Sequence, residues 1–277
     1  MLDLRRSMVV NPTARLVPMA LHPFARTVQT AVRARGLTPA DVVAASYPRS
    51  GSTWLRFVIA DIASQGTDVD FLNIADLSAP LGSHRDAPAL IDGRGRFIKT
   101  HESFRAFPWF TARGLYLVRD GRDVAVSLYH WLRRWNVYRG PFEDYLPAFL
   151  HGRVVNYGSW QEHVASWQGA AARRSGSIVV LRYEDLLGSD GAEILRHTLV
   201  QIGWDVPAEV VELAMKRNVF EKMKQKGADA DAHGTSPRKQ ADTSVPVVRK
   251  GSVGQWREVF SDDQTRMFKD AAGRSLE

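Results

Sequence analysis

Four apolar runs punctuate the chain, and each ends in small or polar residues. They occupy residues 42–47, 97–101, 114–119 and 177–186. The last of them is continuously apolar over residues 178–181 instead of alternating, which is typical of a strand in a parallel sheet. Apolar residues at helical spacing follow the first run, at Leu55, Val58, Ile59 and Ile62. The pattern predicts an α/β fold, a single domain with a central parallel sheet flanked by helices.

The same pattern predicts how the 277 residues are divided. Residues 1–36 form an N-terminal arm and a helix, which Gly36 ends, and residues 37–277 form one large domain. Residues 226–248 have few large apolar side chains and many Gly, Ala, Asp, Ser and Pro, so we expect a mobile lid there. The N-terminal segment lacks the uninterrupted apolar core of a signal peptide, and no run is long enough to span a bilayer.

The amino-acid composition excludes few classes of function. The chain has 37 basic and 30 acidic residues, a net charge of +7, which is compatible with nucleic acid, an anionic membrane surface or a polyanionic small molecule. It has no cysteine, which excludes disulfides and fits a cytoplasmic location. No convincing cluster of metal ligands is visible in the sequence, so we expect no metal.

The first strand-to-helix turn has the residues of an anion site. Arg49 supplies a fixed charge, Ser50, Ser52 and Thr53 supply hydroxyl donors, and Gly51 allows a close approach of the backbone. A helix that starts from such a loop directs unpaired N–H groups and the positive end of its dipole at the ligand. The turn predicts a phosphate- or sulfate-binding strand-loop-helix that is similar to a P-loop.

This loop is not the nucleoside-triphosphate type. That pattern requires G-x-x-x-x-G-K-[ST], whereas residues 45–53 contain one glycine and no lysine. An ordinary strand-to-helix turn with capping Ser and Thr residues is the alternative, and this stretch alone does not decide between the two.

Further candidate groups follow the next two strands. Lys99 and His101 come at the end of the second run, where the carboxyl ends of parallel strands face a common crevice, and His101 is a candidate general base. Arg119 ends the third run, and Ser127 lies on the first turns of the helix after it. We therefore expect a second strand-to-helix anion site.

Several of these segments resemble one family. Residues 47–54 (YPRSGSTW) resemble the 5′-phosphosulfate loop of cytosolic-type sulfotransferases that use 3′-phosphoadenosine 5′-phosphosulfate (PAPS), in a bacterial-like form. Residues 119–131 (RDGRDVAVSLYHW) resemble the family's 3′-phosphate motif, and residues 249–260 (RKGSVGQWREVF) its R-K-G-x-x-G-x-W-x-x-x-F signature. Residues 183–186 (YEDL) and 219–224 (VFEKMK) resemble elements near the adenine.

The resemblance implies in-line transfer of a sulfuryl group from PAPS to a hydroxyl or amine, with 3′,5′-adenosine bisphosphate (PAP) released and no metal needed. It also implies a role for each matching residue. At the reacting end, His101 is the base and Lys99 holds the sulfuryl oxygens. The 5′-phosphate is bound by Arg49 with Ser50, Gly51, Ser52 and Thr53, and the 3′-phosphate by Arg119 and Ser127, with Arg249, Lys250 and Gly251 as a closing clamp. Tyr183 lies near the adenine, and Phe220 stacks on the adenine opposite Trp54. For Arg122 and Asp123 we prefer a capped, ion-paired helix start.

Two departures from the family's pattern matter. Animal cytosolic members usually carry Lys where this chain has Arg49, and a guanidinium stabilises charge but scarcely donates a proton. The family's dimer motif, K-x-x-x-T-V-x-x-x-E, falls on Arg257, Ser261, Asp262 and Arg266, which leaves dimerisation by that route in doubt.

The acceptor is less defined. We expect residues 65–95, 133–160 and 226–248 to shape its site, and the basic and aromatic stretch 133–167 to form one wall. A small molecule, a glycan, a lipid or a peptide natural product is compatible with such a site, and the arginines suggest a carboxylate or phosphate on the acceptor. Three rival functions remain: a non-catalytic bisphosphonucleotide-binding protein, a nucleic-acid-binding protein, for which aromatic and basic residues are also typical, and a kinase-like enzyme.

Overall fold

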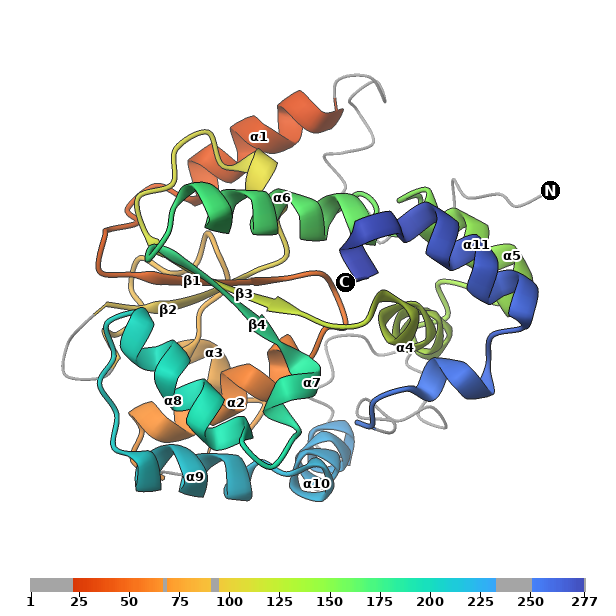
Figure 1. The fold of residues 1–277 in the computed structure, drawn as a ribbon. Helices are drawn as coiled ribbons and strands as arrows, with labels where there is room; N and C mark the ends of the chain where they lie inside the picture. The colour runs from red at the N-terminus through yellow and green to blue at the C-terminus, as the bar shows by residue number, and fades with distance from the viewer. Residues whose placement is uncertain (1–21, 67–68, 91–94, 233–250, 277) are drawn as a thin grey trace.

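A computed structural model describes residues 22–66, 69–90, 95–232 and 251–276 of the protein. A four-stranded parallel sheet lies at its centre, with the strand order β2-β1-β3-β4. The strands are β1 (Val42–Ser46), β2 (Phe97–Thr100), β3 (Arg113–Val118) and β4 (Ile178–Arg182). The predicted fold class, a parallel sheet flanked by helices, is confirmed (Figure 1).

The alternation of side chains along β1 divides the core in two. Val43 and Ala45 point into one cluster, which includes residues of α4 (Gly121–Arg134), α5 (Phe142–Leu150) and α6 (Trp160–Arg173). Val42 and Ala44 point into the other, with α2 (Ser52–Ala63), α8 (Gly191–Gln201) and α9 (Ala208–Arg217). Both faces of the sheet are thus covered, as a buried parallel sheet requires.

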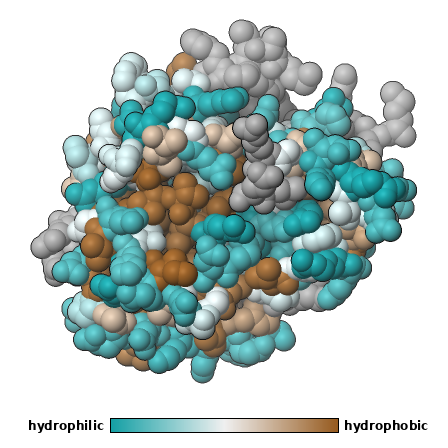
Figure 2. Space-filling model, in the orientation of Figure 1, coloured by the Kyte–Doolittle hydropathy of each residue, from teal (hydrophilic) through white to brown (hydrophobic). Residues whose placement is uncertain are grey.

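The remaining elements surround these layers (Figure 1). They are α1 (His22–Arg33), α3 (Ile74–Leu77), α7 (Tyr183–Leu186), α10 (Phe220–Ala232), α11 (Asp262–Ala272) and the 3₁₀ helices η4 (Phe104–Ala106), η5 (Gln255–Glu258) and η6 (Gly273–Leu276). Helix α1 packs on η4. Figure 2 shows a mostly hydrophilic face with an apolar area over the edge strand β4, where Val179 and Val180 are half-buried.

Two details differ from the sequence-based expectations. The fourth strand ends at Arg182 instead of reaching 186, because the chain turns there into the short helix α7. Residues 226–232 of the expected lid continue α10, and the rest of it lies outside the described residues. Ser261, in the region of the family's dimer motif, caps α11 through a reciprocal pair of hydrogen bonds with Gln264. Within the described ranges, no helix combines the length and the apolar character that a membrane span requires.

Candidate functional site

The carboxyl ends of the strands open onto a cavity of about 570 Å³. Strand β2 lies on one side of β1, whereas β3 and β4 lie on its other side, so the strand order switches sides between β1 and β3. Ligands of open α/β sheets bind in the crevice at such a switch point. The predicted residues that line the cavity are Arg49, Gly51, Ser52, Thr53, Trp54, Lys99, His101, Arg119, Ser127, Tyr183, Phe220 and Gly251.

The loop after β1 turns sharply through two left-handed residues. Arg49 has a φ of 74° and Gly51 a φ of 97°. A Cβ on Gly51 would lie 2.5 Å from Cδ2 of Tyr183, so only glycine fits beside that ring. A non-glycine residue in the left-handed region, such as Arg49, costs on the order of 1–3 kcal/mol and is typical of ligand-binding loops.

This loop leaves donors available at the start of α2. Gly51 is the N-cap residue and makes no side-chain capping bond, so the first N–H groups of the helix have no capping side chain. Ser50 is buried, and its hydroxyl has no hydrogen-bond partner among the described residues. Ser50 itself is not among the residues that line the cavity.

A second group of donors gathers at the end of β3. The Arg119 guanidinium is buried and lies 4.7 Å from the centre of the Tyr183 ring. Its Nε has no partner among the described residues. Nε of Arg49 donates to Oγ of Ser127 at 3.2 Å. The Arg49 side chain therefore extends to the second predicted anion group, although the resemblance assigns it to the first.

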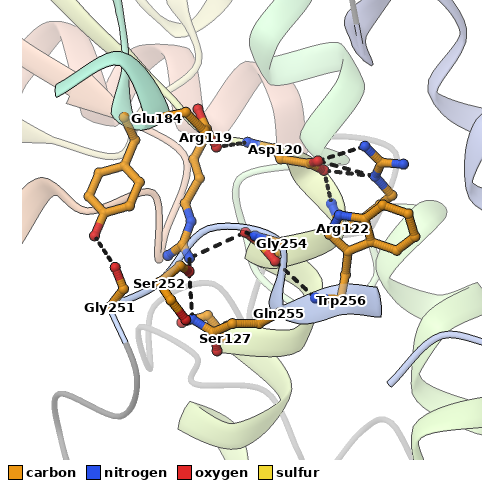
Figure 3. A network of polar contacts seen from close by, with 12 residues as sticks. Arg119, Asp120, Arg122, Ser127, Glu184, Gly251, Ser252, Gly254, Gln255 and Trp256 are labelled. Carbon is orange, nitrogen blue, oxygen red and sulfur yellow. Dashed lines mark hydrogen bonds and ion pairs between the residues drawn. The ribbon is translucent and has the colours of Figure 1, made fainter. Parts of the chain in front are cut away.

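A buried carboxylate ties this group to the C-terminal loop. Asp123 accepts hydrogen bonds from the backbone N–H groups of Gly254 at 2.8 Å and Trp256 at 3.0 Å. Its carboxylate also lies 3.6 Å from Nη2 of Arg119, and that nitrogen donates to the carbonyl oxygen of Ser252 at 3.1 Å. Figure 3 shows Arg119 beside this loop, with its hydrogen bond to Ser252. Asp123 thus fixes the described part of the R-K-G-x-x-G segment against Arg119.

The expectation for the start of α4 is correct in outline, with a different cap. Asp120 is the N-cap residue and accepts from the N–H of Arg122 at 2.9 Å. The Arg122 guanidinium pairs with Asp120 at 2.7 Å and covers the Trp256 ring at 3.8 Å. Arg122 is therefore structural, whereas Asp123 pairs with Arg119.

The end of β2 supplies a basic nitrogen. Nδ1 of His101 lies 2.7 Å from the carbonyl oxygen of Ser46, which can only accept, so Nδ1 carries the proton and Nε2 is left with its lone pair. Burial, followed by the charge of Lys99, lowers the pKa of His101 well below its ordinary value. The ring is therefore neutral at neutral pH and able to accept a proton.

Lys99 lies two residues away along the same strand and lines the same cavity. Burial, followed by the charges of Arg56 and Arg33, lowers its pKa to about 7. Arg56 is itself held by Ser78, through Oγ at 3.0 Å and the carbonyl oxygen at 2.7 Å. The intervening Thr100 points away from the cavity, and its Oγ1 accepts from the N–H of Glu102.

Helix α1 forms a wall of the cavity that we did not predict. Arg26, Gln29 and Arg33, at i, i+3 and i+7, line it together with Glu102. Glu102 is buried and accepts two hydrogen bonds from Arg26, at 2.7 and 2.9 Å, while Nη1 of Arg33 lies 3.5 Å from the same carboxylate. Three donor side chains at this spacing were the available signal in the sequence.

The predicted acceptor wall is only partly present. Residues 154–157 line the cavity, whereas most aromatic residues of the 133–167 stretch are in the core. Its arginines do not line the cavity; Arg134, for example, is buried and pairs with Asp231 of α10 at 2.6 Å. The described residues of 65–95 contribute nothing to the lining either. Arg249 and Lys250 lie outside the described residues.

No group of three or more potential metal ligands occurs in the part of the chain that the structure describes.

Comparison with known proteins identifies relatives over most of the chain. Residues 39–277 match the sulfotransferase domain family. Sulfotransferase 1B1 of Mus musculus is 32% identical over 262 residues, which cover 87% of this chain and 85% of that protein. Sulfotransferase 1A1 of Mus musculus is 30% identical over 251 residues, which cover 83% and 82%.

Solved structures share the fold. Retinol dehydratase in a complex with retinol and PAP matches with a TM-score of 0.69 and 23% identity, over 91% of this chain and 86% of that chain. Mouse sulfotransferase SULT7A1 complexed with PAP matches with a TM-score of 0.64 and 24% identity, over 89% and 87%. At these identities the likeness is one of fold alone.

Proposed function

This chain belongs to the sulfotransferase domain family, and from that membership we propose that it transfers a sulfuryl group from PAPS to a hydroxyl or amine of a small molecule, a glycan or another natural product, and releases PAP. The proposed reaction uses no metal. A cytoplasmic location, which the lack of cysteine suggests, is part of the proposal.

The residues of the cavity fit such a donor. PAPS carries anionic groups at its 5′ and 3′ ends, and the cavity has donors at the start of α2 and, separately, at Arg119 and Ser127. Arg119 lines the cavity, and its buried Nε has no partner among the described residues, as expected of a donor that a ligand engages. Trp54 and Phe220 line the same cavity, so the adenine can lie between them.

At the reacting end, this chain supplies a base and a cation. Nε2 of His101 is placed to remove the proton of the acceptor hydroxyl, and the Lys99 ammonium to hold the oxygens of the sulfuryl group. Arg49 contributes charge without proton donation, because a guanidinium remains protonated. The acceptor oxygen forms a bond to sulfur as the bond between sulfur and the phosphate oxygen breaks, and the 5′-phosphate leaves with the electron pair.

The observation that carries this proposal is the neutral His101 in the same cavity as Lys99, Arg49 and Arg119. Incubation with PAPS and a panel of alcohols, phenols and amines, followed by mass spectrometry, tests it. We expect a product that has gained one SO₃ group, together with PAP. Tight binding of PAP without any sulfated product would support the rival function, a non-catalytic nucleotide-binding protein.

Deprotonation of Lys99 should lower kcat/KM for PAPS at alkaline pH. Because the pKa of Lys99 is lowered to about 7, the empty cavity loses this charge as the pH rises through that value, and kcat/KM for PAPS should fall there. The fall in kcat should come at higher pH, because a bound anionic donor raises the pKa. In the Lys99→Arg variant, kcat/KM for PAPS should not fall in this pH range, since a guanidinium stays charged. If kcat/KM falls in that variant as it does in the unmodified protein, Lys99 is not the group whose titration causes the fall.

Asp123 allows a test in which charge and geometry predict opposite results. If only charge mattered, Asp123→Asn would strengthen PAP binding, because a carboxylate beside Arg119 is removed. If Asp123 holds the loop, binding should weaken, because the amide has one acceptor oxygen for the two N–H donors of Gly254 and Trp256. A buried unsatisfied N–H costs about 1–3 kcal/mol, so we expect the Kd of PAP to rise roughly 5- to 150-fold.

The control variant for this measurement is Asp185→Asn, which removes an exposed carboxylate near the end of β4. It should leave PAP binding within about twofold of the unmodified protein. Tighter binding of PAP by Asp123→Asn would show that charge, and not the position of the loop, dominates.

A further inference from the structure

The cavity that His101 lines has two unlike walls. Leu128 and Trp131 of α4, with Val154 and Val155, form an apolar wall. Arg26, Gln29 and Arg33 of α1 form the other, and all three side chains carry hydrogen-bond donor groups. A flat or elongated apolar body with a polar substituent fits between such walls.

The α1 wall lies beside the proposed base. Glu102, which both arginines contact, follows His101 directly in the sequence. Tyr157 links the two sides: the His101 ring lies edge-on to its ring, with centroids 5.6 Å apart, and the Arg26 guanidinium lies 4.4 Å from the centre of that same ring. The arginines are therefore part of the acceptor end and not of the adenine end, which Trp54 and Phe220 mark.

Positive charge exceeds negative charge at this wall. Two guanidiniums, of Arg26 and Arg33, face one carboxylate, that of Glu102, which leaves one net positive charge among the described lining residues of the wall. Both oxygens of Glu102 are occupied by Arg26, at 2.7 and 2.9 Å. Arg33 is anchored by Leu81, whose carbonyl oxygen accepts from Nε at 3.0 Å and from Nη2 at 2.6 Å, so Nη1 is the nitrogen that remains for an acceptor. The Arg33 side chain is 40% exposed, against 25% for Arg26. The electrostatic effect reaches Lys99, whose lowered pKa owes part of its shift to Arg33.

On the basis of the proposed function, we propose that the acceptor is a hydroxylated apolar molecule that carries a carboxylate or a similar anionic group, and that Arg33 is the specificity-determining residue that pairs with this group. The apolar wall of α4 and residues 154–155 receives the body of such an acceptor, and its hydroxyl reaches His101. The arginines of 133–153, from which an acidic acceptor was expected, are not involved.

A matched pair of phenols tests this proposal. One is 3-(4-hydroxyphenyl)propionate, and the other is the corresponding amide, which has nearly the same shape and no charge. We expect kcat/KM at a fixed PAPS concentration to favour the acid by at least about tenfold, a difference of about 1.4 kcal/mol. The preference should decrease as the salt concentration rises, because the pair is partly exposed.

Substitutions of Arg33 and Arg35 test which residue causes the preference for the acid over the amide. Arg33→Gln should bring the ratio of acid to amide close to one, and Arg33→Lys should keep part of the preference because it keeps the charge. Arg35→Gln is the control: it removes an equal charge from an exposed position next to α1 that does not line the cavity, and it should leave the ratio as it was. An acid preference that survives Arg33→Gln undiminished, or an amide used as well as the acid by the unmodified protein, would overturn the proposal.

Binding to the PAP-loaded protein separates this proposal from the proposed function. If the acid binds more tightly than the amide by calorimetry, and Arg33→Gln abolishes the difference, the anionic subsite is supported even where no sulfated product forms. In that case it is the sulfotransferase activity that fails. If both phenols are sulfated equally, the activity is supported and the anionic subsite is overturned. Equal binding, or no binding, of the two phenols also overturns it.

Discussion

His101→Ala should lower turnover by about two to four orders of magnitude, the usual contribution of a positioned general base. The expected cause is specific. The Ser46 carbonyl holds the proton on Nδ1 at 2.7 Å, and burial keeps the ring neutral, so the substitution removes a nitrogen that is ready to accept a proton. Steady-state kinetics with a sulfated product as readout measures this loss.

PAP binding provides the internal control for this variant. His101 is not among the groups that we assign to the phosphates or the adenine, so the Kd of PAP should change little. His197→Ala, which removes an exposed histidine on α8, should retain full turnover. Turnover in His101→Ala comparable to that of the unmodified protein would show that another group accepts the proton.

Arg119→Ala should weaken PAP binding by roughly 10- to 150-fold, because a hydrogen bond to a charged group contributes about 1.5–3 kcal/mol. The side chain is buried at the carboxyl end of β3, and its Nε has no partner among the described residues, so it can donate to the phosphate without breaking an existing hydrogen bond. Adenosine 5′-monophosphate lacks the 3′-phosphate. The ratio of its Kd to that of PAP should therefore collapse in Arg119→Ala.

Arg122→Ala is the matched comparison for Arg119→Ala. Arg122 lies three residues away, but it pairs with Asp120 and covers Trp256 instead of lining the cavity. We expect its loss to change PAP affinity by less than about fivefold, the order of one cation–π contact, and to leave the preference for the 3′-phosphate intact. An unchanged preference in Arg119→Ala would contradict the placement of that phosphate.

Local signals were sufficient for the fold and for many of the residues that line the cavity. The sharp loop at 47–51 requires a glycine where the chain turns, and apolar runs that end in charged residues mark the strand ends. The carboxyl ends of parallel strands meet at one edge of a sheet, so the positions of Lys99 and His101 at the end of β2 and of Arg119 at the end of β3 are enough to predict that they share a cavity.

Features that depend on tertiary contacts were missed. The sequence shows Asp123 as one more acidic residue in a first helical turn, and only the packing of the C-terminal loop reveals its two N–H partners. The direction of the Arg49 side chain toward Ser127 depends on the spacing of β1 and β3. Similarly, α1 precedes the matched domain, and its distance along the chain from His101 concealed its place in the cavity wall.

A crystal structure of the protein with PAP bound tests the central proposal most directly. We expect the 3′-phosphate within hydrogen-bonding distance of Arg119 and Ser127, the 5′-phosphate against the loop of residues 49–53 at the start of α2, and His101 open to the space beyond the 5′-phosphate. A nucleotide bound outside this cavity, or bound in the reverse direction with its 5′-phosphate at Arg119, would contradict the proposal.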